Sequence, residues 1–416
     1  MAVQSKTVLK GYFNTGDYPT EAQFTALIDS LSHRAGLFNV VDYGAVGDGN
    51  TPDTAAIQAA ANDAIAHGGT LYFPPAPVWW HIGDTILLQP ASGVEFTMHM
   101  LGDIQPNGII YTGAGDKPVF RSLGWRHSKI SGIHLKTSLH AGAVNNTVAF
   151  DCDTSAAFPV TSELMWENCR VNMDGTGTGH IGWRLGHSRV TDDNSQFQWI
   201  DCMVNGSTQL GTQGEIGWCI GAMDALSFTW LGCWNTNLYR AITNIPRAGG
   251  ASPTGGGSFF FYGCGGGYNN VEIEYARKAD TLVVSGGRYE NGQQFLVVDN
   301  SAEPLLAPSV NLTGTHVAAF RGTNQFLFRS SGSLTLTDVD VEAKTLIGEE
   351  WVGPDLGADL ITLGVATGYT RCKVDGGAYE SADPFYTAAA GTVKASVTGA
   401  LLQDSVNHAT GFATDH

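Results

Sequence analysis

Positive charge is scarce in this chain of 416 residues. It carries 22 Lys and Arg against 39 Asp and Glu, which gives a formal net charge of −17. Nucleic-acid binding needs a basic surface that neutralises phosphates, and the sequence contains no run of Lys and Arg. We therefore expect no nucleic-acid partner.

Long apolar runs and paired cysteines are also missing. No stretch of about 18 apolar residues marks a membrane span, and the first residues, MAVQSKTVLKGYFNTG, lack the apolar run of a signal peptide. We therefore expect a chain that is made as a soluble protein and does not insert into a membrane. None of the seven Cys lies in a close pair such as C-x-x-C, so we expect no metal site and no cofactor.

The sequence does contain a short repeated pattern: apolar, any, apolar, any, then Gly, Asn or Asp, then a small or apolar residue. Its intervals run from 23 residues (Gly263 to Gly286) to 38 residues (Asp338 to Gly376), which is typical of a structural repeat whose loops vary in length. The Gly, Asn or Asp position of the pattern falls at Gly132, Asn168, Asp201, Gly232, Gly263, Gly286, Gly314, Asp338, Gly376 and Gly399.

A position restricted to these three residue types predicts one sharp backbone bend in every repeat. Gly, Asn and Asp adopt the left-handed conformation at low steric cost, and such a bend lets the strands on both sides of it point inward side chains into one interior. With 43% hydrophobic residues available for a core, the pattern predicts an all-β fold, a single-stranded right-handed parallel β-helix. The inward columns then include Trp166, Trp199, Trp230, Cys169, Cys202, Cys233 and Cys264, as core side chains rather than disulfides or metal ligands.

The ends of the chain predict helices. Residues 19–33 read as a helix with Thr20 and Gln23 as a capping box, and an Ala-rich helix from about 53 to 66 is expected to cover the open end of the β-helix. The first helix has an apolar stripe of Phe24, Leu27, Ile28 and Leu31, whose partner is either its own β-helix or another chain. The expected segments are an N-terminal anchoring or oligomerisation segment (1–35), the β-helix entry with its capping helix (36–76), the β-helix (77–403) and a C-terminal tail (404–416).

Two stretches resemble known protein families. The run from Phe38 to Gly49, FNVVDYGAVGDG, followed by Asp53-Thr54 and by GGTLYFPP at 68–75, resembles the opening of the pectate-lyase-3-like family, although Pro52 stands where that opening usually has an Asp. The resemblance implies a right-handed β-helix of the kind found in bacteriophage tailspikes and capsule depolymerases. The segment from Gly11 to Phe24 resembles a leader of phage tail proteins. Together they imply a virion spike.

The resemblance also implies partners. It points to a homotrimer that binds a host-surface polysaccharide, capsule or lipopolysaccharide, and that contacts other virion proteins through its N-terminal segment. An anionic glycan would be repelled at long range by the net charge, so neutral glycans, or glycans captured by local Arg groups, fit better. The family opening is structural and transfers no catalytic residue, so candidates come from outward positions of the repeat.

The first candidate cluster follows the bend. Counting outward positions places Asp340 and Glu342 near Glu290, with Arg288 and His316 on neighbouring coils as substrate-binding groups. Asp340 and Glu342 are two residues apart on one strand, about 7 Å between Cα atoms, which is within reach of an inverting hydrolase. The alternative is a solvated face whose charges keep the sheet soluble.

The second candidate cluster lies on the third strand of each coil. If Ile273 points inward, Glu272 and Glu274 are expected to point outward near the substrate-binding candidates Arg240 and Arg184, as an acid and base pair or as an ion-pair network. Trp234 and Tyr239 are expected to stack on sugar rings.

Three functions remain open from the sequence. One is a spike that binds and cleaves a host polysaccharide, and another is a spike of the same fold that only binds glycan or serves structurally. The third is a free polysaccharide lyase or hydrolase, which the missing signal peptide disfavours.

Overall fold

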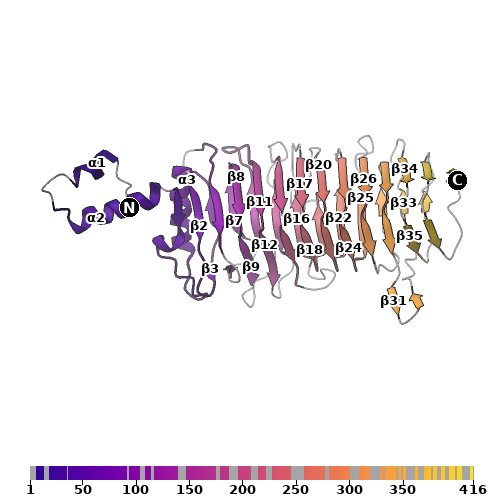
Figure 1. Cartoon of the computed structure of the whole chain (residues 1–416), viewed down its shortest axis with the longest axis horizontal. Coiled ribbons are helices and arrows are strands. Elements are labelled where there is room, and N and C mark those ends of the chain that lie inside the picture. The colour runs from indigo at the N-terminus through magenta and orange to yellow at the C-terminus, as the bar shows by residue number, and fades with distance from the viewer. Residues whose placement is uncertain are drawn as a thin grey trace.

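The computed structural model confirms the predicted parallel β-helix (Figure 1). It describes residues 6–13, 18–34, 36–90, 93–103, 108–113, 117–138, 147–174, 179–186, 195–207, 214–221, 227–244, 257–276, 281–299, 309–318, 328–330, 333–342, 345–347, 350–352, 361–363, 370–375, 378–381, 386–388, 393–398, 401–404 and 413–415.

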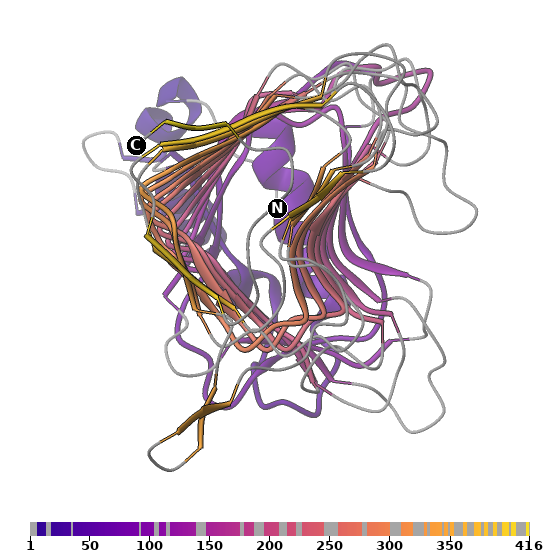
Figure 2. The ribbon, with the colours of Figure 1, turned by 90° about the vertical axis from the view of Figure 1, so that its right-hand side faces the viewer.

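Three parallel sheets form the walls of the β-helix and enclose one interior (Figure 2). The first sheet contains β1 (Leu37–Asn39), β2 (Thr70–Phe73), β5 (His99–Gly102), β8 (Arg126–Ser131), β11 (Ser162–Glu167), β14 (Phe197–Ile200), β17 (Ser227–Leu231), β20 (Ser258–Tyr262), β23 (Thr281–Ser285), β26 (Ser309–Thr313), β29 (Ser333–Thr337), β34 (Thr370–Asp375), β37 (Val393–Thr398) and β39 (Ala413–Asp415).

The second sheet follows the bend in each coil, and the third sheet completes the coil. The second contains β3 (Trp80–Ile82), β6 (Ile109–Tyr111), β9 (His134–Ser138), β12 (Arg170–Asp174), β15 (Met203–Asn205), β18 (Trp234–Thr236), β21 (Gly265–Gly267), β24 (Arg288–Glu290), β27 (His316–Ala318), β30 (Asp340–Glu342), β35 (Ala378–Ser381) and β38 (Leu401–Asp404). The third contains β4 (Ile86–Leu88), β7 (Pro118–Leu123), β10 (Val148–Asp153), β13 (Ile181–Leu185), β16 (Ile216–Ile220), β19 (Arg240–Thr243), β22 (Val271–Ala276), β25 (Gln294–Asp299), β28 (Phe328–Ser330), β33 (Ile361–Leu363) and β36 (Tyr386–Ala388).

Two strands stand apart from the three walls. β31 (Thr345–Ile347) and β32 (Glu350–Val352) form an antiparallel hairpin that projects from the side of the β-helix (Figure 1).

The predicted bends have the predicted conformation. Asn168 has φ 52° and Asp201 φ 51°, in the left-handed region, and Gly132, Gly232, Gly263, Gly286, Gly314 and Asp338 also have positive φ. The predicted bends at Gly376 and Gly399 lie outside the described residues. Each bend joins a strand of the first sheet to one of the second, as β11 is joined to β12.

The inward columns are buried ladders. The rings of Trp166, Trp199 and Trp230 stack at centroid distances of 5.3 and 4.8 Å, and all three side chains are fully buried. The cysteines predicted to face inward are buried and free, which confirms their place in the core.

Helix α3 (Thr54–His67) covers the first coil, as predicted, and buries Ile57 and Ala61 against it. The side chain of Gln58 forms hydrogen bonds with the backbone of β4, the edge strand of the third sheet. Its amide nitrogen donates to the Leu87 carbonyl at 2.9 Å, and its oxygen accepts from the Leu87 N–H at 2.8 Å. An edge strand is thereby closed by a helix side chain.

Helices α1 (Lys6–Gly11) and α2 (Glu21–Arg34) project beyond this end of the molecule (Figure 1). The capping box is confirmed, because the Gln23 N–H donates to Thr20 Oγ1 and the Thr20 N–H donates to Gln23 Oε1. Of the apolar stripe, Phe24 is exposed and contacts Phe13, with ring centroids 5.6 Å apart. Among the described helices, none combines the length and apolar character needed to cross a membrane.

Candidate functional site

The outer face of the second sheet, called here the second-sheet face, carries the first candidate cluster. Strand register aligns the residues two and four positions after each bend into two columns. One column pairs Arg170, Met203, Trp234, Gly265, Arg288, His316 and Asp340 in sequence, and the next pairs Asn172, Asn205, Thr236, Gly267, Glu290, Ala318 and Glu342.

Trp234 forms a platform on this face. Its side chain is 39% exposed, and its ring lies against Gly265 on the next strand, where an added Cβ would come within 2.2 Å of Trp234 Cζ3. One strand further along the column, Arg288 Nη2 lies 3.0 Å from Glu290 Oε2, and Arg288 is largely exposed. An exposed indole beside a charged hydrogen-bonding pair is suited to stack on a sugar ring and to bind its hydroxyl groups.

Glu290 is paired with Arg288, and its joint action with the other carboxylates of this face stays a prediction. It lies in the neighbouring column, two strand spacings from Asp340, which is about 10 Å along the sheet. Asp340 is exposed, while the side chain of Glu342 lies outside the described residues. The pairing of Asp340 with Glu342 therefore stays a prediction.

Glu272 does not lie on the surface, and the prediction that it points outward is wrong. It is fully buried inside the β-helix, and Asn269 Nδ2 donates to Glu272 Oε1 at 2.8 Å and to Asn235 Oδ1 at 2.5 Å. Burial raises the pKa of Glu272 to about 8, so its carboxyl is neutral at pH 7. A side chain at this depth cannot contact a polysaccharide on the surface.

The prediction failed because alternation breaks near the start of third-sheet strands. Ala149 and Phe150 are consecutive and both belong to the buried core, as do Ala241 and Ile242. In the register with the next strand, Phe150 and Ile242 have partners, whereas Ala149 and Ala241 have none. Glu272 occupies the column of Ala149 and Ala241, where two successive side chains face inward.

Glu274 does point outward, as predicted, and its carboxylate is neutralised. Arg240 Nε lies 2.6 Å from Glu274 Oε2, and Thr243 Oγ1 donates to the same oxygen at 2.9 Å. The Arg240 guanidinium also lies over the Tyr239 ring, 5.1 Å from its centroid. This arrangement is an ion-pair network with a cation–π contact at its edge.

Arg184 does not join Glu274. It lies three strands away in the same column, about 14 Å along the sheet, and binds Asp151 instead, with Nε to Oδ1 at 2.8 Å and Nη2 to Oδ2 at 2.9 Å. Asp151 and Asp153 are buried carboxylates that the sequence reasoning missed. Their i, i+2 spacing in VAFDCD was the available signal, since it places both on one face of a strand.

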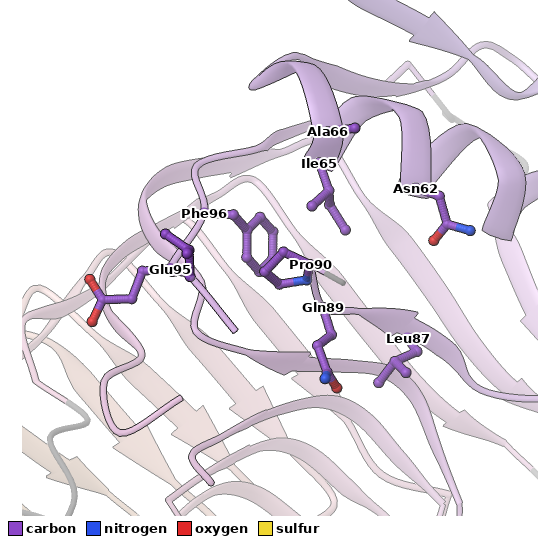
Figure 3. A pocket seen from close by; sticks show the side chains of 9 residues that line it. Asn62, Ile65, Ala66, Leu87, Gln89, Pro90, Glu95 and Phe96 are labelled. Atoms are coloured by element: carbon purple, nitrogen blue, oxygen red, sulfur yellow. The ribbon is translucent and has the colours of Figure 1, made fainter. Parts of the chain in front are cut away.

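A cavity of about 680 Å³ lies beside the capping helix, away from all of these residues (Figure 3). It is lined by side chains of α3, the end of β4 and the following segment, including Ile65, Leu87 and Phe96. No predicted site residue lines it. Within the described part of the chain, no three His, Cys, Asp or Glu side chains are arranged to hold a metal ion.

Comparison with known proteins confirms the resemblance seen at the start of the β-helix. Residues 37–76 match the model of the family described as rhamnogalacturonase A/epimerase, pectate lyase-like. Over 117 residues the chain is 46% identical to mannuronan C5-epimerase AlgE3 of Azotobacter vinelandii, covering 27% of this chain and 6% of that protein. Over 156 residues it is 28% identical to AlgE1 of the same organism, covering 36% and 9%. The chain thus spans less than a tenth of the length of these curated relatives.

Solved structures include proteins of similar fold. The Dettilon tailspike protein aligns with a TM-score of 0.49 and 12% identity, covering 96% of this chain and 74% of that one. The family match and the three stacked sheets together identify the chain as a parallel β-helix whose entry, at residues 37–76, is of the pectate lyase-like type.

Proposed function

We propose that this protein is a virion spike that recognises a host-surface polysaccharide through the second-sheet face, as a homotrimer. The observation that carries the proposal is the exposed Trp234 platform, whose ring lies against Gly265, the register partner of Arg288 in the Arg288–Glu290 pair. Flat faces of stacked parallel strands offer equivalent positions every 4.8 Å or so, a spacing that suits a linear polymer.

One further observation supports a polysaccharide ligand, and another supports the role as a virion spike. The matched family and the mannuronan epimerases are named for polysaccharide chemistry. The N-terminal segment resembles a leader of phage tail proteins and projects beyond the cap, where an element that contacts other virion proteins would lie (Figure 1).

Recognition is proposed ahead of cleavage. The acid and base pair expected at Glu272 and Glu274 is split, because one carboxyl lies inside the β-helix and the other is held by Arg240 outside it. Cleavage is the second candidate and would use Asp340 and Glu342, which are two residues apart on β30.

The test is to incubate the purified protein with capsule or lipopolysaccharide from candidate hosts and to measure both retention and new reducing or unsaturated ends. We expect retention, and we expect Trp234→Ala to weaken binding about tenfold or more, because a buried aromatic contact dominates such interfaces. Trp79→Ala is the matched control, since Trp79 is a partly exposed tryptophan about 24 Å away along the stack.

Equal retention of wild type and Trp234→Ala would contradict the proposed site. New ends that appear with wild type and disappear with Asp340→Asn would favour cleavage over recognition alone.

A further inference from the structure

We propose that the outer face of the first sheet, from β14 to β29, is the surface through which copies of this chain pack against each other, an inference that rests on the proposed homotrimer and assigns its contact surface. We call it the charge-free face. The outward positions of its six strands hold Ser, Thr, Asn, Gln, Ile, Leu, Val, Phe and Tyr, and none of those that the structure describes is Asp, Glu, Lys, Arg or His.

The absence of charge is local and is not a property of the fold. Earlier strands of the same sheet carry ion pairs on their outer side, such as Lys129 with Glu167 at 2.6 Å and Arg126 with Glu95 at 2.8 Å. The second-sheet face carries Arg288 and Asp340 at equivalent depth along the stack. A face that only meets solvent has no need to exclude charge over six strands in a chain with a net charge of −17.

The charge-free face carries apolar, partly exposed side chains on its first four strands, β14 to β23. Ile200, Leu231 and Tyr262 are register partners on three successive strands, and Leu231 is 47% and Tyr262 40% exposed. Phe260 and Val283 are partners in the adjacent column, and the Phe260 and Tyr262 rings lie parallel, 6.4 Å apart. Ser, Thr and Asn follow on β26 and β29. An exposed apolar and aromatic patch that continues into uncharged Ser, Thr and Asn side chains is suited to a protein–protein contact.

The occupant that fits is a second copy of this chain. Two copies, each with a net charge of −17, repel each other through their acidic surfaces, and the charge-free face lets them meet without burying a charge. A basic partner would instead be drawn to the acidic surfaces. Six strands of about 4.8 Å and five residues of about 3.3 Å outline roughly 475 Å² per copy, or about 950 Å² for two copies, the size of a weak interface. We therefore expect association that depends on concentration in the micromolar range.

The test is to measure the mass of the full chain by light scattering and sedimentation over a concentration series. We expect wild type to associate, and we expect Leu231→Glu to shift the dissociation constant upward by at least about tenfold, because every copy would bring a carboxylate into a charge-free contact. Thr313→Glu provides a second charge at an exposed position of the same face. Leu101→Glu is the matched control, because Leu101 is 41% exposed on β5 of the same sheet, outside the charge-free face.

The outcomes separate the contact surface from the polysaccharide site of the proposed function. Wild type that stays monomeric at the highest concentration, or Leu231→Glu and Thr313→Glu variants that are folded and associate like wild type, would overturn the inferred contact surface. Loss of polysaccharide retention in these two variants with unchanged mass would also overturn it, by making the face a glycan site. Loss of association with retention intact is the expected result, and it leaves the Trp234 experiment to decide the function.

Discussion

The carboxyl of Glu272 shows, at the scale of one residue, how burial controls charge. Its Oε1 accepts from Asn269, whose own Oδ1 accepts from the Leu238 N–H at 2.8 Å, and no Lys or Arg is among the buried residues in the described part of the chain. Desolvation therefore dominates and raises the pKa of Glu272 from its ordinary value of 4.5 to about 8. The folded protein holds a proton that the unfolded chain releases.

This pKa predicts a pH dependence of stability. Because the folded pKa is raised, the contribution of Glu272 is fully present below about pH 4.5 and declines as the pH rises to about 8. Each pKa unit corresponds to about 1.4 kcal/mol, so the decline is on the order of 4 kcal/mol. The free energy of unfolding of wild type should fall between pH 5 and pH 8 more than that of Glu272→Gln, measured by denaturant titration. Parallel curves for the two proteins would show that Glu272 is not buried as described.

At the scale of one element, the surroundings of strand β21 explain why its three residues are all glycine. Gly265 lies under the Trp234 ring on the outer side, and Gly266 faces the buried carboxyl of Glu272, where an added Cβ would lie 2.5 Å from Oε2. At Gly267 the contact is milder, because the atom nearest to an added Cβ would be the Glu290 carbonyl oxygen at 3.2 Å. The strand is thus confined between an indole outside and an acid network inside.

Alanine substitutions should report this confinement. We expect Gly266→Ala to destabilise the protein by about 1 to 3 kcal/mol, since overpacking displaces the Glu272–Asn235 network, and Gly267→Ala to cost less. A double-mutant cycle with Glu272→Ala should give a coupling energy above about 0.5 kcal/mol for Gly266→Ala and near zero for Gly267→Ala. Equal costs for the two glycines would argue that the inner side of β21 is not in contact with Glu272.

At the scale of the whole molecule, the stacked coils protect what lies inside them. Cys169, Cys202, Cys233 and Cys264 occupy four successive coils of one inward column, and their thiols lie near backbone carbonyls of the same or the preceding coil. Burial raises the pKa of Cys202 and Cys233 well above the ordinary value, so both stay protonated. Reagent access requires the coils to separate.

Thiol labelling should therefore follow unfolding of the stack. We expect six of the seven cysteines, the six that are buried and free, to react with a disulfide reagent only at the rate of unfolding, in native buffer and along a urea series. The seventh, Cys372, has a side chain outside the described residues and is the one allowed to react early. Rapid modification of more than one thiol per folded chain would contradict the buried column.

The sequence by itself determined the features that depend on local conformation and periodicity. The left-handed bends at Asn168 and Asp201, the capping box of Thr20 and Gln23, and the inward column that holds Trp199 all follow from residue type and spacing. Only the tertiary structure decided that Glu272 faces inward, that Arg184 binds Asp151, and that six strands share a charge-free face. One physical reason is that the strict alternation of inward and outward side chains fails where three sheets meet around one interior. The other is that the residues of one surface come together only when strands far apart in the sequence lie in register.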